Sequence, residues 1–319
     1  MLSLNKIEID RLSGDIAPIE GIWGGIFYYP QFVKPSARAL NLRGESYLLE
    51  SDGKFICALN LLLQNRKWVR AATIPLLFQY FGPLPIGESL EAKEIEQIDR
   101  YISLACDFAY FSLPPSLNGE PVFPRGWRVV RTITLALQER EMSGWGSGFR
   151  DDVKNKIRKA GREKIKVEIC ESLPEQLWMT TYRRRRISIP LPAASLSQWC
   201  SELVADSMLR LYIAKSGEVP VAFRGELMQG QFAYDWIAGS DPEYHATGAN
   251  QLLMAEIGDD LKSRGIRTWD LVGGQIKSIA DFKRSFGARE ICHYQAYKSF
   301  NVKGSIFGFA RKLRNAWRD

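Results

Sequence analysis

The sequence predicts a mixed α/β (α+β) protein built from two similar domains, and three observations predict this class. The chain has 319 residues, which is enough for about two domains at roughly 150 residues each. Its hydrophobic content of 45% and charged content of 25% are ordinary for domains with apolar cores. Along the chain, apolar residues recur first with the period of two of a strand and then with the 3.6-residue period of a helix.

Residues 1–140 are predicted to form the N-terminal domain, a β-meander followed by a helix and a strand. Asp52-Gly53 separates two apolar runs and supplies the positive φ of a tight hairpin turn. The Gly and Pro residues between 80 and 87 predict a loop, because they interrupt regular elements. In chain order we expect strands at 46–51, 54–63 and 67–77, a helix at 91–111 and a strand at 131–138.

Residues 141–303 are predicted to form the C-terminal domain. The glycines between 143 and 149 predict a flexible joint at its start, and Gly265 is a stop signal for the helix before it. In chain order we expect helices at 149–164, 173–186, 196–207 and 248–264, and strands at 166–170, 209–217, 219–229, 231–240, 268–273 and 289–300.

Residues 304–319 predict an amphipathic helix that completes the first domain. One stripe is apolar and consists of Ile306, Phe309, Leu313 and Trp317. We expect this stripe to dock on the first domain, with peripheral membrane contact through 304–319 as the alternative. No apolar run approaches the roughly 20 residues of a membrane helix, and the first residues carry acids and lack an apolar signal region. The sequence therefore predicts a cytoplasmic protein without a transmembrane segment.

The chain lacks the motifs of several enzyme classes. It has two histidines and no GxSxG, HExxH or GxGxxG motif, which argues against a hydrolase elbow, a catalytic zinc and a dinucleotide site. We therefore expect no metal and no tightly bound cofactor. Acyl transfer to an amine remains, because it can depend on positioning, backbone donors and one cation.

The net charge of +7 is unevenly distributed. Residues 150–166 contain eight Lys/Arg against three acids, and residues 183–186 are four consecutive arginines. Concentrated positive charge favours an anionic partner such as a phosphate group, a nucleic acid or an acidic lipid surface. On a helix the four arginines cannot all point one way, so we expect one or two of them to bind phosphate.

The segment 245–289 resembles the donor-site half of acyltransferases of the GNAT superfamily, and more narrowly the Fem-type peptidyltransferases of peptidoglycan synthesis. The resemblance is carried by a helix, the strand Trp269-Asp270-Leu271, then Gly273-Gly274, Phe282-Lys283 and Phe286-Gly287. Upstream, Tyr80-Phe81-Gly82-Pro83 is similar to the P-R-G-P loop of that family's first domain, with Phe81 in place of Arg. The resemblance implies tandem GNAT-like domains.

The resemblance also bears on the acyl donor. GNAT enzymes carry [QR]-x-x-G-x-[GA] where this chain has His245, Gly248 and Asn250, so only the glycine matches the loop that cradles the pyrophosphate of acetyl-CoA. Fem-type enzymes use aminoacyl-tRNA and do not need that cradle. The resemblance therefore favours aminoacyl-tRNA, with acetyl-CoA as the other possible donor.

Some site residues are implied by the resemblance and others by the local pattern: of the four arginines one or two are expected to face a cleft, and Tyr234 and Trp236 alternate with Asp235 on a strand, where core packing is the stronger expectation and lining of the cleft the alternative. Lys283 is the expected catalytic residue, which neutralises charge near the donor or the developing oxyanion. Asp270 is expected to cap the turn that follows it rather than to act as a base. The expected donor-binding residues are Phe282, Gly248, Asn250, Gly273 and Gly274, and the expected acceptor-binding residues are Arg183, Arg184, Tyr234 and Trp236.

The function implied is transfer of an acyl or aminoacyl group to an amine of a nucleotide- or lipid-linked cell-envelope precursor, as in formation of peptidoglycan interpeptide bridges. One alternative is an acetyl-CoA-dependent N-acetyltransferase for a sugar or polysaccharide precursor. The other alternative is a binding module that keeps the fold without the chemistry.

Overall fold

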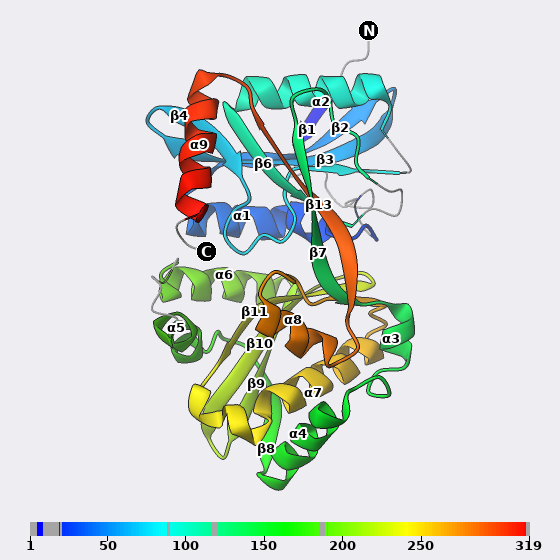
Figure 1. Ribbon diagram of the computed structural model, residues 1–319, viewed down its shortest axis with the longest axis vertical. Helices are drawn as coiled ribbons and strands as arrows, with labels where there is room; N and C mark the ends of the chain where they lie inside the picture. Colours follow the sequence, from blue (N-terminus) through cyan, green and yellow to red (C-terminus); the bar gives the residue numbers. More distant parts are fainter. Residues whose placement is uncertain are drawn as a thin grey trace. The chain divides into compact units, whose positions relative to one another are not determined.

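The computed structural model describes residues 5–8, 19, 21–87, 90–115, 120–184, 189 and 191–316. The chain forms two compact units. Unit 1 consists of Met1–Thr132 and Cys292–Asp319, and unit 2 consists of Ile133–Ile291 (Figure 1). Among the described residues, the helices are all too short or too polar to cross a membrane.

Unit 1 contains an antiparallel meander followed by a helix and a parallel strand. Asp52 and Gly53 have φ of 50° and 77°, so the predicted hairpin turn is confirmed. In chain order the elements are β1 (Asn5–Glu8), α1 (Pro30–Ala39), β2 (Arg43–Ser51), β3 (Lys54–Arg66), β4 (Val69–Thr73), β5 (Pro83–Pro85), α2 (Ala92–Ala105) and β6 (Phe108–Leu113). The strands β2, β3 and β4 are antiparallel neighbours, and β4 pairs in parallel with β6.

Two expectations for unit 1 are wrong. The helix predicted at 91–111 ends at Ala105, and Phe108–Leu113 is the strand β6, because a long-range bond from Arg70 N–H to the Asp107 carboxylate brings this segment beside β4. The loop predicted at 80–87 contains the short strand β5, which pairs with β3. The backbone hydrogen bonds on either side of this strand run from Asn60 N–H to Gly82 C=O and from Ile86 N–H to Ile56 C=O. Pro83 and Pro85 therefore do not have to donate.

Unit 2 repeats the order of meander, helix and parallel strand. The bounds are α3 (Glu139–Ser143), α4 (Asp151–Arg162), β8 (Ile165–Cys170), α5 (Glu175–Arg184), α6 (Ala193–Ala205), β9 (Leu209–Ser216), β10 (Val219–Gln229), β11 (Phe232–Ser240), η4 (Pro242–Thr247), α7 (Ala249–Ser263), β12 (Thr268–Asp270) and α8 (Lys277–Arg284). The helices α5 and α6 pack on one face of the sheet and α7 packs on the other. Gly265 has φ 78° directly after α7, which confirms the predicted helix stop.

The segment predicted as a flexible joint is packed into the core of unit 2. The indole N–H of Trp145 donates to the C=O of Ala255 at 3.0 Å, and its ring lies against Trp269 and Phe286. A Cβ at Gly258 would lie 2.0 Å from the Trp145 ring, so α7 needs a glycine where the indole crosses it. The expectation of a joint at 143–149 is therefore wrong.

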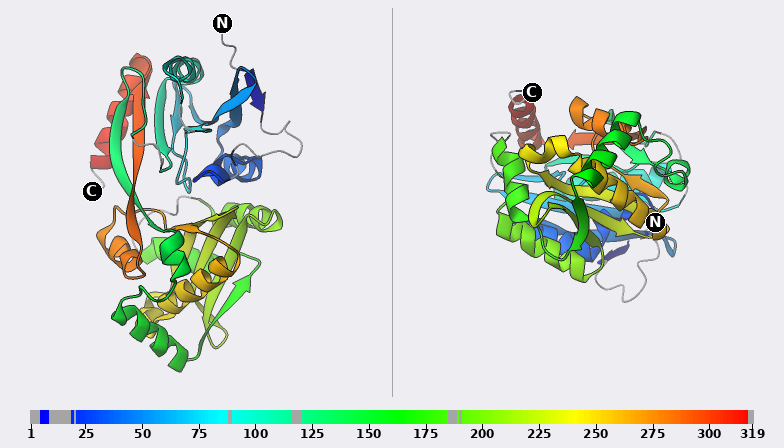
Figure 2. Two further views of the ribbon diagram at one scale, coloured as in Figure 1. Left: turned by 90° about the vertical axis from the view of Figure 1, so that its right-hand side faces the viewer. Right: turned by 90° about the horizontal axis from the view of Figure 1, so that it is seen from below.

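Two long strands carry the chain from one unit into the other (Figure 2). The strand β7 (Arg128–Leu137) begins in unit 1, and its last residues pair with β12 of unit 2. The strand β13 (Arg289–Ser299) begins in unit 2, and its later residues pair with β6 of unit 1. Each half of the sequence therefore contributes its last strand to the unit formed mainly by the other half.

The C-terminal helix α9 (Val302–Ala316) belongs to unit 1 and packs against β4 and β6. The predicted docking of its apolar stripe is wrong, because Ile306, Phe309 and Leu313 are exposed. Phe307 is buried instead, and its ring lies 5.3 Å from that of Phe108. Trp317, the last residue of the predicted stripe, lies outside the described residues.

Candidate functional site

The parallel pair of unit 2 opens before β11 ends. Paired residues are Phe232 with Thr268, Ala233 with Trp269 and Tyr234 with Asp270. The strand β12 ends at Asp270, whereas β11 continues to Ser240. Among the described strands, none pairs with residues 235–240 on the side that β12 has left. This opening lies at the carboxyl end of β12, where an open α/β sheet commonly holds its ligand.

Four buried charged side chains lie beside this opening, and we call them the charge cluster: Arg224 and Glu226 on β10, Asp235 on β11 and Lys283 on α8. Arg224 and Asp235 form an ion pair, with side chains only 9% and 6% exposed. Glu226 is fully buried and accepts the indole N–H of Trp269 at 2.7 Å. The register of β10 against β11 shifts between Gly225 and Glu226, and such a bulge re-aims side chains.

Lys283 holds the turn that follows β12. Its Nζ donates to the C=O groups of Leu271 and Val272 and lies 3.5 Å from that of Gly273. Val272 and Gly273 have φ of 58° and 56°, and this left-handed path aims successive carbonyls at one point. An ammonium group has three donors, so three carbonyl oxygens can account for all of them.

Asp270 holds the same turn from the other side. One carboxylate oxygen accepts Val272 N–H at 2.8 Å and the Thr134 hydroxyl at 2.5 Å. This is the turn-capping position expected from the sequence. Because Asp270 and Lys283 both anchor residues 271–273, the turn is fixed beside the opening.

The electrostatics of the charge cluster follow from its burial. Burial, and then the neighbouring charge of Asp235, raises the pKa of Glu226 well above its usual range. Burial lowers the pKa of Lys283. The two basic groups, Arg224 and Lys283, thus lie in one buried environment with the acids Glu226, Asp235 and Asp270. Two buried oxygens, Asp235 Oδ1 and Glu226 Oε1, have no hydrogen-bond partner among the described residues, so the cluster retains unused acceptor capacity.

The loop before α7 packs closely against α4. Gly248 has φ 85°, and a Cβ there would lie 2.2 Å from the backbone oxygen of Lys156, so close packing against α4 accounts for this glycine. Ala249 N–H donates to Thr247 Oγ1, and Gln251 N–H donates to Gly248 C=O. These amides are already engaged within the chain. Asn250 is half-buried in the first turn of α7.

The structure brings some of the other predicted donor residues together. The half-buried Phe282 ring lies 5.6 Å from the Arg224 guanidinium carbon and 5.2 Å from the Phe286 ring. Gly273 lies in the turn that Lys283 holds. A Cβ at Gly274 would lie 2.9 Å from the side chain of Ile133. Phe282, Lys283 and Gly273 are therefore neighbours of the opening, whereas Gly248 and Asn250 lie at the start of α7.

The predicted acceptor residues are placed differently. Tyr234 is fully buried, and Trp236 is buried with its ring 4.9 Å from that of Trp199 on α6. Both alternate with Asp235 along β11, so they lie on the opposite face of the strand. Core packing of these two rings is observed, and their contact with an acceptor stays a prediction. Arg183 is exposed in the last turn of α5, and the side chain of Arg184 lies outside the described part.

Arg224 and Glu226 were not among the residues predicted from the sequence, and Asp235 had no predicted role. Each lies inside a strand that is otherwise apolar, in VPVAFRGELMQ or FAYDWIAGS. That signal is available in the sequence, because a charge in a buried strand must be paired or neutralised. What the sequence does not give is the register that places the three charges beside Lys283.

Comparisons with known proteins identify the class of this fold. Residues 147–284 match the model of an acetyltransferase (GNAT) domain. No curated protein matches the sequence. The chain is similar in structure to FemX, with a TM-score of 0.60 and 9% identity over 92% of this chain and 96% of that one. It is also similar to a tandem GNAT protein from the clavulanic acid biosynthesis pathway, with a TM-score of 0.51 and 9% identity over 94% and 99%.

A third similar structure is L-PGS from Bacillus licheniformis, with a TM-score of 0.51 and 11% identity over 86% of this chain and 93% of that one. Identities this low establish the fold alone. The prediction of a mixed α/β protein with tandem GNAT-like domains is confirmed. The resemblance to Fem-type proteins is confirmed at the level of the fold, and the residues that match the acetyltransferase (GNAT) domain model lie within unit 2.

Proposed function

We propose that this chain transfers an aminoacyl group from aminoacyl-tRNA to an amine of a cell-envelope precursor. The observation that carries the proposal is the opening between β11 and β12 with the charge cluster at its side. An extended acyl end fits beside the unpaired edge of residues 235–240. Buried charges in a water-poor site act strongly on charge that develops during reaction.

The chemistry needs few participants. The acceptor nitrogen attacks the ester carbon of the donor, a C–N bond forms, and the C–O bond to the tRNA ribose breaks. Asp235 Oδ1 takes the proton that the attacking nitrogen loses, and the departing ribose oxygen takes it in turn. The positive charges of Arg224 and Lys283 stabilise the oxyanion through their field.

Lys283 acts in this scheme mainly by position. Its donors are directed at the carbonyls of residues 271–273, so it fixes the wall of the opening and supplies charge without donating to the substrate. This differs from a lysine that binds the oxyanion directly.

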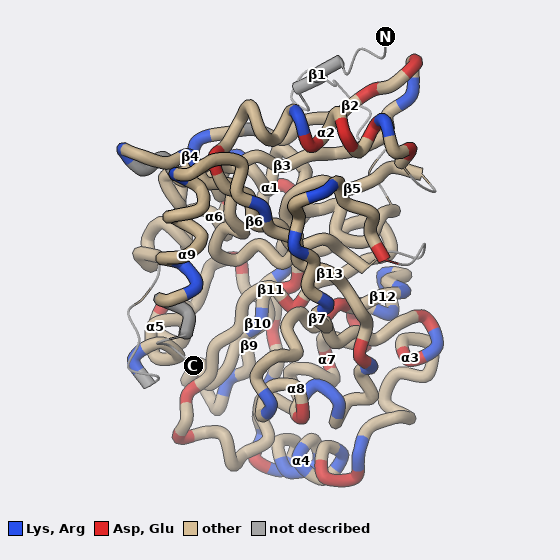
Figure 3. The backbone as a smooth tube through the Cα atoms, turned by 45° about the horizontal axis from the view of Figure 1, so that its top comes forward, with Lys and Arg blue, Asp and Glu red and all other residues tan. Residues whose placement is uncertain are grey.

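Two observations support aminoacyl-tRNA over CoA. The amides of Ala249 and Gln251 at the start of α7 donate within the chain, so these two donors are already used and a pyrophosphate would have fewer partners there. The helix α4 contains several Lys and Arg residues (Figure 3). Two of them, Lys156 and Arg158, are exposed and suited to a nucleic acid backbone. The FemX-like fold is consistent with the same choice.

A second candidate is an acetyl-CoA-dependent N-acetyltransferase for a sugar or polysaccharide precursor. It is favoured by the match of residues 147–284 to an acetyltransferase (GNAT) domain. In this version the same opening receives the acetyl thioester, and a C–S bond breaks in place of the C–O bond.

The test offers both donors to the purified chain with a muropeptide or an amino sugar as acceptor. We expect transfer from charged tRNA, and we expect Asp235→Asn to lower it at least about hundredfold. Asp206→Asn, an exposed change outside the site, is the matched control. Transfer from acetyl-CoA alone would replace the proposal with the second candidate. Salt-sensitive tRNA binding without any turnover would leave a binding module.

A further inference from the structure

One exposed stripe of α9 is apolar from Val302 to Leu313. Val302, Ile306, Phe309 and Leu313 are between 47% and 76% exposed. At about 100° per residue they fall within an arc of about 60° on the helix surface. Four large apolar side chains in one exposed stripe are unusual for a surface helix, because such a stripe normally faces the core.

The opposite face of α9 packs on unit 1, and this packing holds the stripe towards solvent. A Cβ at Gly304 would lie 1.8 Å from the backbone oxygen of Asp107, and one at Gly308 would lie 2.9 Å from the Phe108 ring. The two glycines therefore let the helix approach β6 closely, and Phe307 is buried between them. Arg311 stacks over the Tyr110 ring, with its guanidinium carbon 3.8 Å from the ring centroid.

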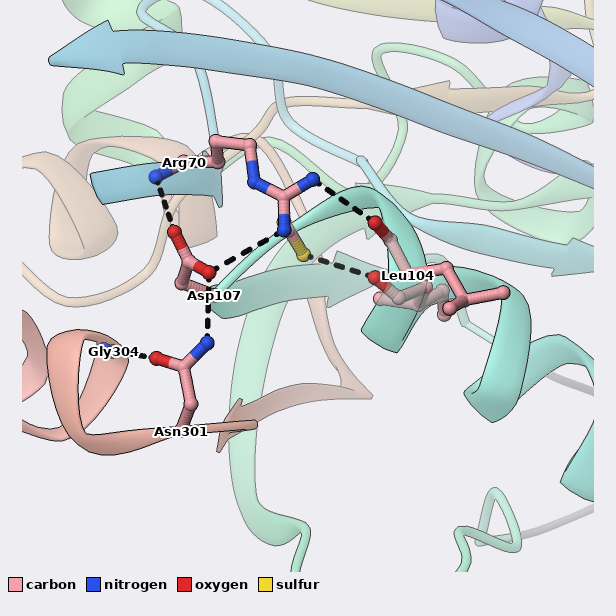
Figure 4. Close-up of polar contacts among 7 residues, drawn as sticks. Arg70, Leu104, Asp107, Asn301 and Gly304 are labelled. Carbon is pink, nitrogen blue, oxygen red and sulfur yellow. Dashed lines mark hydrogen bonds and ion pairs between the residues drawn. The ribbon is translucent and has the colours of Figure 1, made fainter. Parts of the chain in front are cut away.

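A polar anchor fixes the start of the helix (Figure 4). The Asp107 carboxylate accepts Arg70 N–H and the side-chain amide of Asn301, each at 2.8 Å. The side-chain oxygen of Asn301 in turn accepts Gly304 N–H at 3.0 Å. Because these bonds set the rotation of α9 about its axis, the stripe cannot turn inward without breaking them.

The charge around the stripe has one sign. Residues 302–316 contain no acid. Lys303 and Lys312 are exposed, and at about 100° per residue they fall on either side of the stripe. The turn between β3 and β4 adds the exposed Lys67 and the half-exposed Trp68, whose ring lies 6.4 Å from that of Phe307. An apolar stripe with flanking lysines is the pattern of a helix that lies in a membrane interface, and a Trp that packs against the same helix is typical of such sites.

We propose that α9 and the Lys67-Trp68 turn bind the surface of an anionic lipid bilayer. The helix lies flat on the bilayer, its stripe reaches the acyl boundary, and its lysines contact acidic headgroups. With fifteen residues it covers about 22 Å of surface. This inference does not rest on the proposed function, since it uses only residues of unit 1.

Two other occupants fit the surface less well. A nucleic acid would use the lysines but leave the aliphatic stripe in water. A second copy of the chain would cover the stripe but bring like charges together, because this helix offers no acid to pair with the lysines of a copy.

The test is sedimentation of the full chain with phosphatidylcholine vesicles, with and without phosphatidylglycerol. We expect binding only with phosphatidylglycerol. The double change Ile306→Ser with Phe309→Ser should lower the partition coefficient at least about tenfold. Lys303→Gln with Lys312→Gln should lower it about fivefold for each lysine. The matched control is Ile169→Ser with Val219→Ser, two exposed apolar residues of unit 2.

Because the changed side chains are exposed, the variants should keep the wild-type unfolding temperature, which is measured alongside. The proposal is overturned if anionic vesicles do not bind the chain, or if the Ile306 and Phe309 changes leave binding as it was. Self-association that the same changes abolish would assign the stripe to a second copy. Binding of tRNA that depends on the lysines, without vesicle binding, would assign the surface to nucleic acid.

Discussion

Unit 1 and unit 2 treat the same parallel pair in opposite ways. In unit 2, β11 and β12 separate after Tyr234, and the strand edge beyond is left unpaired by the described strands. In unit 1, β4 ends at Thr73, but the chain returns to fill the gap. Phe81 exchanges both backbone hydrogen bonds with Ser112 of β6, at 2.7 and 3.0 Å, and β5 pairs with β3. We call residues 81–85 the plug.

The two units therefore differ in what lies beside the parallel pair of strands. The plug is apolar and tightly packed: Phe81 is fully buried, and a Cβ at Gly82 would lie 2.4 Å from the Phe111 ring. The opening of unit 2 is instead lined by the charge cluster. The repeated fold therefore leaves one strand edge open beside the charge cluster and fills the corresponding place in the other unit with its own chain.

The largest expected effect is on the opening of unit 2. Lys283→Met should lower the rate of acyl transfer at least about hundredfold, about 2.7 kcal/mol in activation free energy, because residues 271–273 lose their anchor and the cluster loses a charge. Initial rates measure this. Lys277→Met is the matched control, since Lys277 lies on the same helix and is 93% exposed. Equal rates for the two variants would remove Lys283 from the mechanism.

The next effect is on the plug of unit 1. Gly82 has φ 114°, so Gly82→Ala combines backbone strain with overlap on Phe111 and should lower the free energy of unfolding by about 2–4 kcal/mol. Urea denaturation measures it. Gly53→Ala, at φ 77° with open space around its Cβ position, should cost only about 1 kcal/mol. A similar cost at both glycines would show that the plug is loosely packed.

Glu226 makes the stability of unit 2 depend on pH. The pKa of Glu226 is raised in the folded state. Its contribution to the free energy of unfolding is therefore fully present below the unfolded pKa of about 4.3, and it is lost as the pH rises through the folded pKa. Glu226→Gln stays neutral. The stability of this variant relative to wild type should therefore grow by about 1.4 kcal/mol per pH unit in that window. Urea denaturation at several pH values checks it, and a constant difference would show that Glu226 is ionised throughout.

The smallest effect concerns the anchor of α9 in unit 1. Burial alone would raise the pKa of Asp107, but the bonds from Arg70 and Asn301 outweigh it and the net shift is downward. The contribution of Asp107 to the free energy of unfolding is therefore present above the unfolded pKa of about 3.9, and it is lost as the pH falls through the folded pKa. Asp107→Asn should cost about 1 kcal/mol at neutral pH. Faster amide hydrogen exchange in residues 302–316 would report the loss of this anchor. An unchanged exchange rate would show that Asp107 does not hold α9 in place.

Local signals in the sequence predicted much of the fold. The Asp52-Gly53 turn and the Gly265 helix stop need only local backbone geometry, and both are where they were expected. The helix end at Ala105 was missed because residues 108–111 are all apolar, and such a short run is compatible with a helix or a strand. A contact from the distant Arg70 decides that they form a strand.

The site was harder to predict for a related reason. Lys283 stands out in the sequence through its neighbours, but its carbonyl partners depend on the positive φ of Val272, a residue with no preference for that conformation. The apolar stripe of α9 was predicted to face the core, but it is exposed. The face that packs on β6 contains Gly304 and Gly308, which carry no apolar signal in the sequence. Their lack of a side chain is what permits close packing.

The exchange of strands between the two halves also sets an order of assembly on the ribosome. Unit 2 needs no residue beyond 291, whereas unit 1 needs residues 294–299 of β13 beside β6. Synthesis runs from the N-terminus, so unit 2 can complete its sheet while unit 1, which begins the chain, still waits for a strand. Until that strand emerges, β6 presents an open edge. The part made first is thus the part finished last, and a nascent chain stopped before residue 292 would expose this edge to aggregation.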